Sequence, residues 1–313
     1  MYAKTLLPLL AFLLCGFADA AHAAASRLAP GVLVDADAGR AFVTDPAGFA
    51  QAISLADGRS AWISREPAVP LLESGGRLFA LGRIEARGVG LLLLLDPATG
   101  EVLDRVAFDV PEHVAASLVP RPKVRFGIEA HPTAQGARVY WREVALPLRG
   151  AYLGDGSDAE RITEGAFDLL LDAQRNLALP LREPAAPPAA PSVDLAPAER
   201  LPALGERQFR GLDDASAMAS APVADPVFGA RWQWTLRARG ARNAVAGPAL
   251  PYAWLPFALL GETLLYRTEP VAGGADGRVV GHGARLVAWD LARGAERWHV
   301  DVLDPVYRGP MPP

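Results

Sequence analysis

Two stretches of this sequence decide the fold: residues 52–62 read AISLADGRSAW, and residues 288–298 read AWDLARGAERW. They align without a gap over eleven positions and share five residues. Gly58 and Gly294 suit a tight turn with positive φ between two strands. Trp62 and Trp298 follow four residues later, on the returning strand. A gapless match of this length predicts an internal repeat of strand, turn and strand.

A weaker copy of the same turn lies between the two. Residues 96–100 read DPATG, so Asp96 and Gly100 have the spacing of Asp290 and Gly294. Gly100 follows Gly58 by 42 residues. This step matches the length of one four-stranded blade of a β-propeller, about 40–45 residues. The spacing therefore favours a repeat protein in which each repeat is one small sheet.

A third candidate turn runs from Asp172 to Asn176, after the apolar run FDLLL. We place Asn176 at the glycine position, because asparagine tolerates the left-handed region. Short β-type runs such as residues 77–81 and 263–266 are punctuated by Gly or Pro. They predict an all-β protein, whether sandwich, barrel or propeller. The best candidate for a helix is the window 158–167.

At residues 52–62, 94–100 and 286–298 the chain resembles the quinoprotein-like, or PQQ-like, β-propeller repeat family. In that family the glycine turn closes each blade and the tryptophans dock between blades. The resemblance implies a β-propeller of roughly six to seven four-stranded blades. It also implies two kinds of function. Enzymes of the family bind pyrroloquinoline quinone and calcium, often beside a cysteine pair, whereas members such as the outer-membrane assembly lipoproteins are binding scaffolds.

Residues 1–23 predict a secretory signal peptide. Lys4 precedes an apolar run at residues 6–17, and the triplet AHA at 21–23 gives the best small-x-small cleavage site, with ADA at 18–20 second. A membrane-spanning helix needs about 20 apolar residues, so we expect cleavage rather than an anchor. The mature chain, 24–313, is then soluble and periplasmic or secreted, with no transmembrane anchor.

Cys15, the single cysteine, lies within this signal. Leu14 precedes it, where a bacterial lipoprotein signal places a small residue, so we expect no lipid anchor. Cleavage leaves a chain without cysteine. That chain has no disulfide framework, no thiol nucleophile and no cysteine-based metal site. The cysteine-paired form of the quinone site is therefore also in doubt.

The usual fingerprints of catalysis do not occur in the sequence. There is no phosphate-binding loop, no HExxH zinc motif and no GxSxG nucleophile elbow. The histidines that would remain after cleavage stand singly, without metal-ligand spacing: His113, His131, His282 and His299. The net charge of −4 is small and mixed in sign, which gives no footprint for nucleic acid. We predict no cofactor, and we favour a protein without catalytic activity.

Residues 180–202 contain seven prolines in 23 positions. Proline cannot donate to a sheet ladder, so we predict an exposed Pro/Ala-rich excursion at 180–203. It either separates two domains or interrupts one ring, and the repeat on both sides of it favours the ring. The resulting hypothesis is an exported, non-catalytic propeller that binds a protein or a cell-envelope component. The alternative is an enzyme with a site at the hub, either a degenerate quinoprotein or another type.

Overall fold

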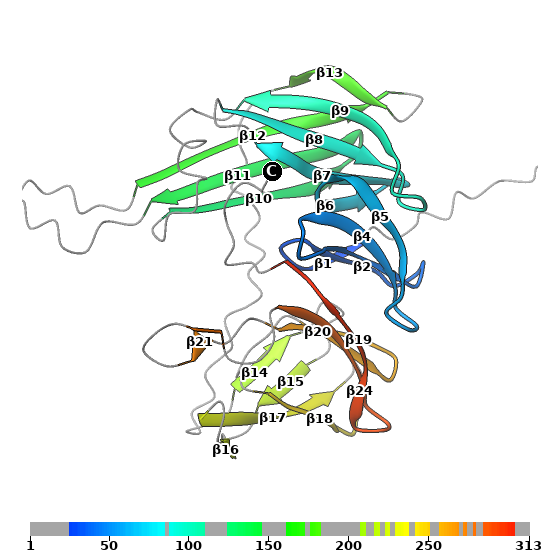
Figure 1. The fold of residues 1–313 in the computed structure, drawn as a ribbon, viewed down its shortest axis with the longest axis vertical. Coiled ribbons are helices and arrows are strands. Elements are labelled where there is room, and N and C mark those ends of the chain that lie inside the picture. The colour runs from blue at the N-terminus through cyan, green and yellow to red at the C-terminus, as the bar shows by residue number, and fades with distance from the viewer. Residues whose placement is uncertain are drawn as a thin grey trace, which may run out of the picture.

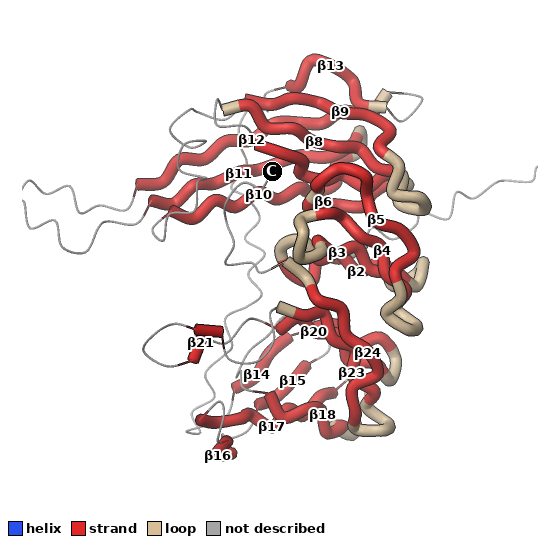
Figure 2. Tube along the Cα trace, in the orientation of Figure 1, coloured by secondary structure: helices blue, strands red, loops and turns tan. Residues whose placement is uncertain are grey.

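The structure, a computed structural model, describes most of the chain between residues 25 and 303. The described ranges are 25–84, 88–109, 124–145, 161–172, 176–182, 207–210, 216–219, 223–225, 229–237, 242–250, 257–268, 272–273, 278–279 and 284–303. The predicted signal peptide, 1–23, lies outside them. Every regular element in these ranges is a strand, so none of them contains a helix that could cross a membrane (Figure 2). The all-β prediction is confirmed.

Three antiparallel sheets form the N-terminal half, and their strands pair in chain order. Sheet 1 contains β1 (Ser26–Ala29), β2 (Val32–Asp35), β3 (Arg40–Thr44), β4 (Phe49–Ser54) and β5 (Ser60–Pro67). Sheet 2 contains β6 (Val69–Ser74), β7 (Arg77–Ile84), β8 (Val89–Leu95) and β9 (Val102–Asp109). Sheet 3 contains β10 (Val124–Thr133), β11 (Gly136–Ala145), β12 (Arg161–Leu171) and β13 (Leu177–Arg182).

Two further sheets and a short ribbon follow. Sheet 4 is built around β17 (Gly229–Arg237), which pairs with β15 (Ser216–Ala219), β16 (Val223–Asp225) and β18 (Val245–Leu250), and β15 pairs in turn with β14 (Arg207–Arg210). Sheet 5 contains β19 (Phe257–Leu260), β20 (Thr263–Thr268), β23 (Arg285–Asp290) and β24 (Ala295–Asp301). The ribbon consists of β21 (Ala272–Gly273) and β22 (Arg278–Val279).

Three expectations differ from this arrangement. The described residues form five sheets of four or five strands, fewer than the six or seven blades expected. The helix considered at 158–167 is wrong, because residues from Arg161 onward form β12 and pair along β11. The Pro-rich excursion begins later than 180, since Pro180 lies within β13. Among the described strands it pairs with β12 alone, so it is an edge strand of sheet 3, where proline is tolerated. The remainder, 183–203, lies outside the described residues.

The inner sheets bury both faces, because neighbouring residues of a strand point to opposite sides. The leucine run in β8 shows this most clearly. Leu93 and Leu95 belong to a core cluster shared with sheet 1. Leu92 and Leu94 belong to a cluster shared with sheet 3. An uninterrupted apolar run is therefore what a strand between two other sheets requires.

The four core clusters fix the spatial order of the sheets. They join sheet 3 to 2, sheet 2 to 1, sheet 1 to 5, and sheet 5 to 4. Figure 1 shows the corresponding arc, with sheet 3 at the top and sheet 4 at the bottom. The first and last sheets of the chain therefore lie side by side. Within the described ranges, no core cluster joins sheet 3 to sheet 4.

Candidate functional site

The repeated turns have one common construction. In each, the glycine N–H donates to a carbonyl four residues earlier, at 2.8 Å for Gly58, 2.8 Å for Gly100 and 2.9 Å for Gly294. All three glycines have positive φ, +72°, +72° and +63°. The residue that opens the turn caps it from its side chain: Asp96 Oδ1 accepts from two backbone N–H groups, and Asp290 Oδ1 accepts from one.

Trp62 on β5 joins sheet 1 to sheet 2. Its Nε1–H donates to the Pro97 carbonyl at 3.1 Å. The indole also lies over Gly100, where an added Cβ would come within 2.4 Å of the ring. Gly100 thus serves two purposes, since it supplies the positive φ of the turn and leaves room for the ring.

Trp298 on β24 makes the same contact between sheet 5 and sheet 1. Its Nε1–H donates to the Leu55 carbonyl at 3.2 Å, across 243 residues of sequence. The ring lies over Gly58, with an added Cβ placed 2.8 Å from Cδ2. β24, the last of the described strands, is thereby attached to the first sheet. Both tryptophans of the predicted repeat thus contact the turn of a neighbouring sheet.

A second donor completes the junction between sheets 1 and 2. Arg40, the first residue of β3, donates to the Pro97 carbonyl at 2.9 Å and to Asp35 Oδ2 at 3.1 Å. Its guanidinium also lies 5.0 Å from the centre of the Phe42 ring. Asp35, opposite Arg40 in the strand register, is only 2% exposed. This ion pair lies beside Trp62, because Arg40 and the indole donate to the same carbonyl.

The equivalent positions of sheet 5 carry no charge. Arg40 pairs with Asp35 on one side, and by the same register Thr263 pairs with Leu260. On the other side, Arg40 and Thr263 each lie opposite the residue four before the turn glycine. A short hydroxyl side chain and a leucine thus replace the long ion pair. The junction between sheets 5 and 1 is left partly unfilled.

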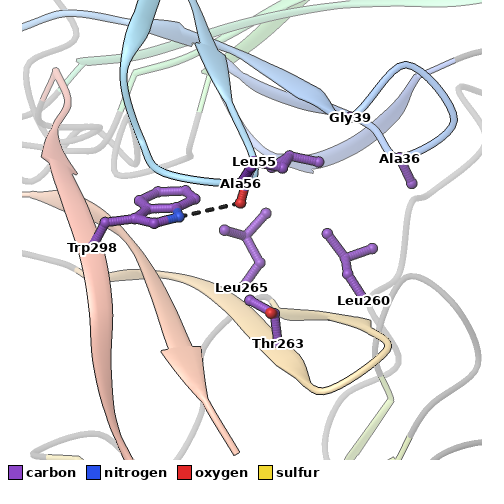
Figure 3. A pocket seen from close by; sticks show the side chains of 8 residues that line it. All are labelled: Ala36, Gly39, Leu55, Ala56, Leu260, Thr263, Leu265 and Trp298. Carbon is purple, nitrogen blue, oxygen red and sulfur yellow. Dashed lines mark hydrogen bonds between the residues drawn. The ribbon is translucent and has the colours of Figure 1, made fainter.

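The result is a hollow of about 260 Å³ beside Trp298 (Figure 3). Its walls come from two turns of sheet 1, those between β2 and β3 and between β4 and β5, and from β19, β20 and β24 of sheet 5. Figure 3 shows the leucine side chains and the Trp298 ring around this space. The lining residues are Ala36, Gly39, Leu55, Ala56, Leu260, Thr263, Leu265 and Trp298.

The lining of the hollow suits recognition rather than proton transfer. None of its side chains titrates, and Thr263 supplies the one hydroxyl. Ligand pockets of enzymes are usually larger, about 300–1,000 Å³, so this space matches one or two apolar side chains. Asp57 at its margin is exposed, and hydrogen bonds from Ser54 and from the Arg59 backbone hold its carboxyl pKa below the usual value. Asp57 also forms an ion pair with Arg59, with 3.5 Å between Oδ2 and Nε, so the margin carries paired charges of both signs.

The third predicted turn has a different construction. Leu171 pairs with Leu177 as Leu95 pairs with Val102, and Asp172 N–H donates to the Asn176 carbonyl. This turn is therefore one residue shorter, and Asn176 takes the place of Glu101 rather than of Gly100. Asp172 still caps it, accepting from the Asn176 N–H at 2.9 Å.

Sheet 2 contacts this shorter turn through a carboxylate. Asp104 lies four residues after Gly100, at the position of the tryptophan in sheets 1 and 5. Its Oδ2 accepts the Leu177 N–H at 2.9 Å, across 73 residues. Where the turn has no glycine to make room for a ring, the neighbouring sheet thus binds the backbone with a small acceptor.

Sequence reasoning missed the residues that distinguish the junctions. The strand register is needed to see that Arg40 of sheet 1 and Thr263 of sheet 5 occupy the same position. It likewise places Asp104 of sheet 2 where sheets 1 and 5 have a tryptophan. A signal existed for Asp104, because extending the turn alignment by four residues reaches it. The described residues hold no group of three or more His, Cys, Asp or Glu side chains placed to bind a metal.

Comparisons with known proteins add little to this picture. No protein-family model and no curated protein matches the chain. Among solved structures, the chain is similar to the crystal structure of BamB from Moraxella catarrhalis, with 14% identity, a TM-score of 0.26 and coverage of 86% of this chain. It spans 63% of the length of that chain. We draw neither fold family nor function from a likeness at this TM-score.

Proposed function

We propose that this chain is an exported scaffold of the β-propeller type that binds another protein of the cell envelope. The observation that carries the proposal is the tryptophan contact from the last sheet to the first, Trp298 to Leu55 and Gly58. In a propeller, radial repetition places the last blade beside the first. Export follows from the predicted signal peptide, and the partner belongs to the compartment that export reaches.

The binding role is supported by the hollow at this junction. The hollow between sheets 5 and 1 has an apolar lining. At the equivalent place between sheets 1 and 2 lies the ion pair of Arg40 with Asp35. Closed packing with native density is the rule in protein interiors. An open apolar recess between rigid sheets is well suited to receive a side chain of a partner, as the centres of protein interfaces do.

Site-specific photo-crosslinking in cells tests the proposal. A benzoyl-phenylalanine at Ala56, on the margin of the hollow, is compared with one at Ala47. Both are exposed alanines in turns of sheet 1, and Ala47 lies in the turn between β3 and β4, at the other end of β4. We expect one specific envelope protein to crosslink at Ala56 and not at Ala47.

A competing variant makes the result specific. Thr263→Arg places a long side chain in the hollow, and we expect it to remove the Ala56 crosslink without unfolding the protein, which circular dichroism checks. The same products at Ala56 and Ala47, or no crosslink at Ala56, would contradict binding at the hollow. Recovery of the chain from the cytoplasmic fraction would contradict export.

A further inference from the structure

The turn between β23 and β24 has the construction of a tryptophan-binding turn, but none of the residues that the structure describes covers its outer face. Gly294 has φ of +63°, as in the two filled turns. A Cβ added at Gly294 would meet no described atom within 4 Å, whereas at Gly58 and Gly100 it meets an indole. Gly294 itself is exposed, while Gly100 is buried and Gly58 is half-buried.

The hydrogen-bond acceptor of this turn likewise receives no donor from the residues that the structure describes. In the filled turns the indole N–H donates to the carbonyl three residues before the glycine, namely Pro97 and Leu55. The corresponding residue here is Leu291. Its N–H donates to the Glu262 carbonyl, which fixes the turn, and no described residue donates to its own carbonyl.

We propose that this turn binds a tryptophan side chain of a partner protein. The ring would lie on Gly294 and its Nε1–H would donate to the Leu291 carbonyl. The two filled turns identify this ligand chemistry, because the same glycine, the same acceptor position and the same backbone hydrogen bond hold an indole in both. Phenylalanine could supply the ring but not the donor.

A cation beside the turn supports an aromatic ligand. Arg293, next to Gly294, is 82% exposed and 3.8 Å from Asp290, so its guanidinium can reach over a ring on the turn. Attraction of a guanidinium to a ring face is strongest for tryptophan. The filled turns have Asp57 and Thr99 at this position, so an arginine distinguishes the open turn.

This inference rests on the proposed binding function, and it is tested apart from it. The probe is an acetylated and amidated peptide with the sequence of residues 60–66, SAWISRE, which carries a docking tryptophan of this chain, here as 5-fluorotryptophan. It is titrated into the full mature protein and followed by fluorine NMR. We expect a shifted fluorine signal, and at least about tenfold weaker binding, measured by competition, for the peptide with Trp→Ala.

Two glycine variants locate the site. Gly294→Ala places a methyl group on the face that the ring would cover, and we expect it to abolish the fluorine shift. Gly76→Ala is the matched control, because Gly76 has φ of +71°, lies in the turn between β6 and β7 of sheet 2 and has no described atom near its added Cβ. It carries the same backbone strain, and we expect it to bind the peptide normally.

If Gly294→Ala does not fold, Gly294→Asn replaces it, since asparagine tolerates positive φ and still covers the face. An unshifted fluorine signal with the native protein, or equal binding by the Gly294 and Gly76 variants, overturns the inference. Such a result does not contradict the proposed function, because the Ala56 crosslink tests binding at the hollow between sheets 5 and 1 and not at the Gly294 turn.

Discussion

The junction of sheets 1 and 2 and the junction of sheets 5 and 1 share one device and differ in how completely it is packed. In both, an indole lies on a turn glycine and donates to the carbonyl three residues earlier. At the first, Arg40 and Asp35 lie beside the indole. At the second, Thr263 and Leu260 leave a hollow of about 260 Å³.

This difference teaches that two junctions with the same tryptophan contact can differ in the packing of the space beside it. The tryptophan fixes the approach of two sheets through one ring contact and one hydrogen bond. Two further positions, opposite each other in β2 and β3 of sheet 1 and in β19 and β20 of sheet 5, then decide whether the junction is closed or open. The tryptophan therefore attaches the two sheets, while the two opposed positions determine whether the junction has room for a partner's side chain.

Removing either tryptophan is the strongest way to break the comparison. We expect Trp298→Ala to lower the free energy of unfolding by about 3–5 kcal/mol, the usual cost of a buried tryptophan. Trp62→Ala should cost about 1 kcal/mol less, because Arg40 still donates to the Pro97 carbonyl and one hydrogen bond is worth about that much. Urea unfolding measures both.

Trp298→Phe is the control, because it keeps an aromatic ring but loses the donor. We expect it to cost about 1 kcal/mol. If Trp62→Ala proves as costly as Trp298→Ala, the second donor at the Pro97 carbonyl contributes nothing to the closed junction.

Removing the ion pair is the next largest change. Arg40→Ala leaves Asp35, 2% exposed, without its cation. Breaking a fully buried pair costs about 3–5 kcal/mol, and because Arg40 is partly exposed we expect about 2–3 kcal/mol in urea unfolding. The double variant Asp35→Asn, Arg40→Ala should recover part of this loss, since it leaves no buried charge. A double variant that is less stable than the single one would contradict the account.

Transferring the ion pair sharpens the comparison with a smaller effect on stability. The double variant Leu260→Asp, Thr263→Arg should close the hollow, with a change in unfolding free energy of about 1 kcal/mol or less. We expect the Trp298 indole N–H to exchange with solvent faster than that of Trp62 in the native protein. In the double variant its exchange should slow toward the Trp62 rate, as measured by NMR.

The conservative variant Thr263→Ser is the control for this exchange measurement, because it keeps the hydroxyl and removes one methyl group. We expect it to leave exchange of the Trp298 N–H fast. Unchanged exchange in the ion-pair variant would mean that Asp35 and Arg40 do not account for the closed junction.

Local features of these junctions could be predicted from the sequence. Gly58, Gly100 and Gly294 take positive φ, and the strands around them form as expected, because a turn and its two strands depend on about ten neighbouring residues. The partner of each tryptophan could not be predicted. Trp62 contacts a turn further along the chain, whereas Trp298 contacts one near its beginning, and only the order of the sheets decides this.

Tertiary pairing also overrode local reasoning at two places. The window 158–167 suggested a helix, but β12 is held by pairing along the whole of β11, including the ion pair of Arg138 with Asp168 at 2.5 Å. Asn176 could be aligned with the turn glycines by spacing, yet the register shortens its turn by one residue. Whether a junction is open or closed could not be predicted either, because it depends on the strand register and on which sheets are neighbours.

The smallest effect tests a surface salt bridge between sheets 1 and 2, at the closed junction. Arg105 on β9 and Glu66 on β5 form an ion pair in which both side chains are well exposed, 49% and 36%, and this hydrogen bond raises the pKa of the Arg105 guanidinium. Exposed pairs contribute about 0.2–1 kcal/mol. We therefore expect Glu66→Gln to lower the unfolding free energy by less than about 1 kcal/mol, with the difference vanishing in high salt. A larger loss that does not depend on salt would mean that this surface ion pair, and not only the Trp62 and Arg40 contacts, holds sheets 1 and 2 together.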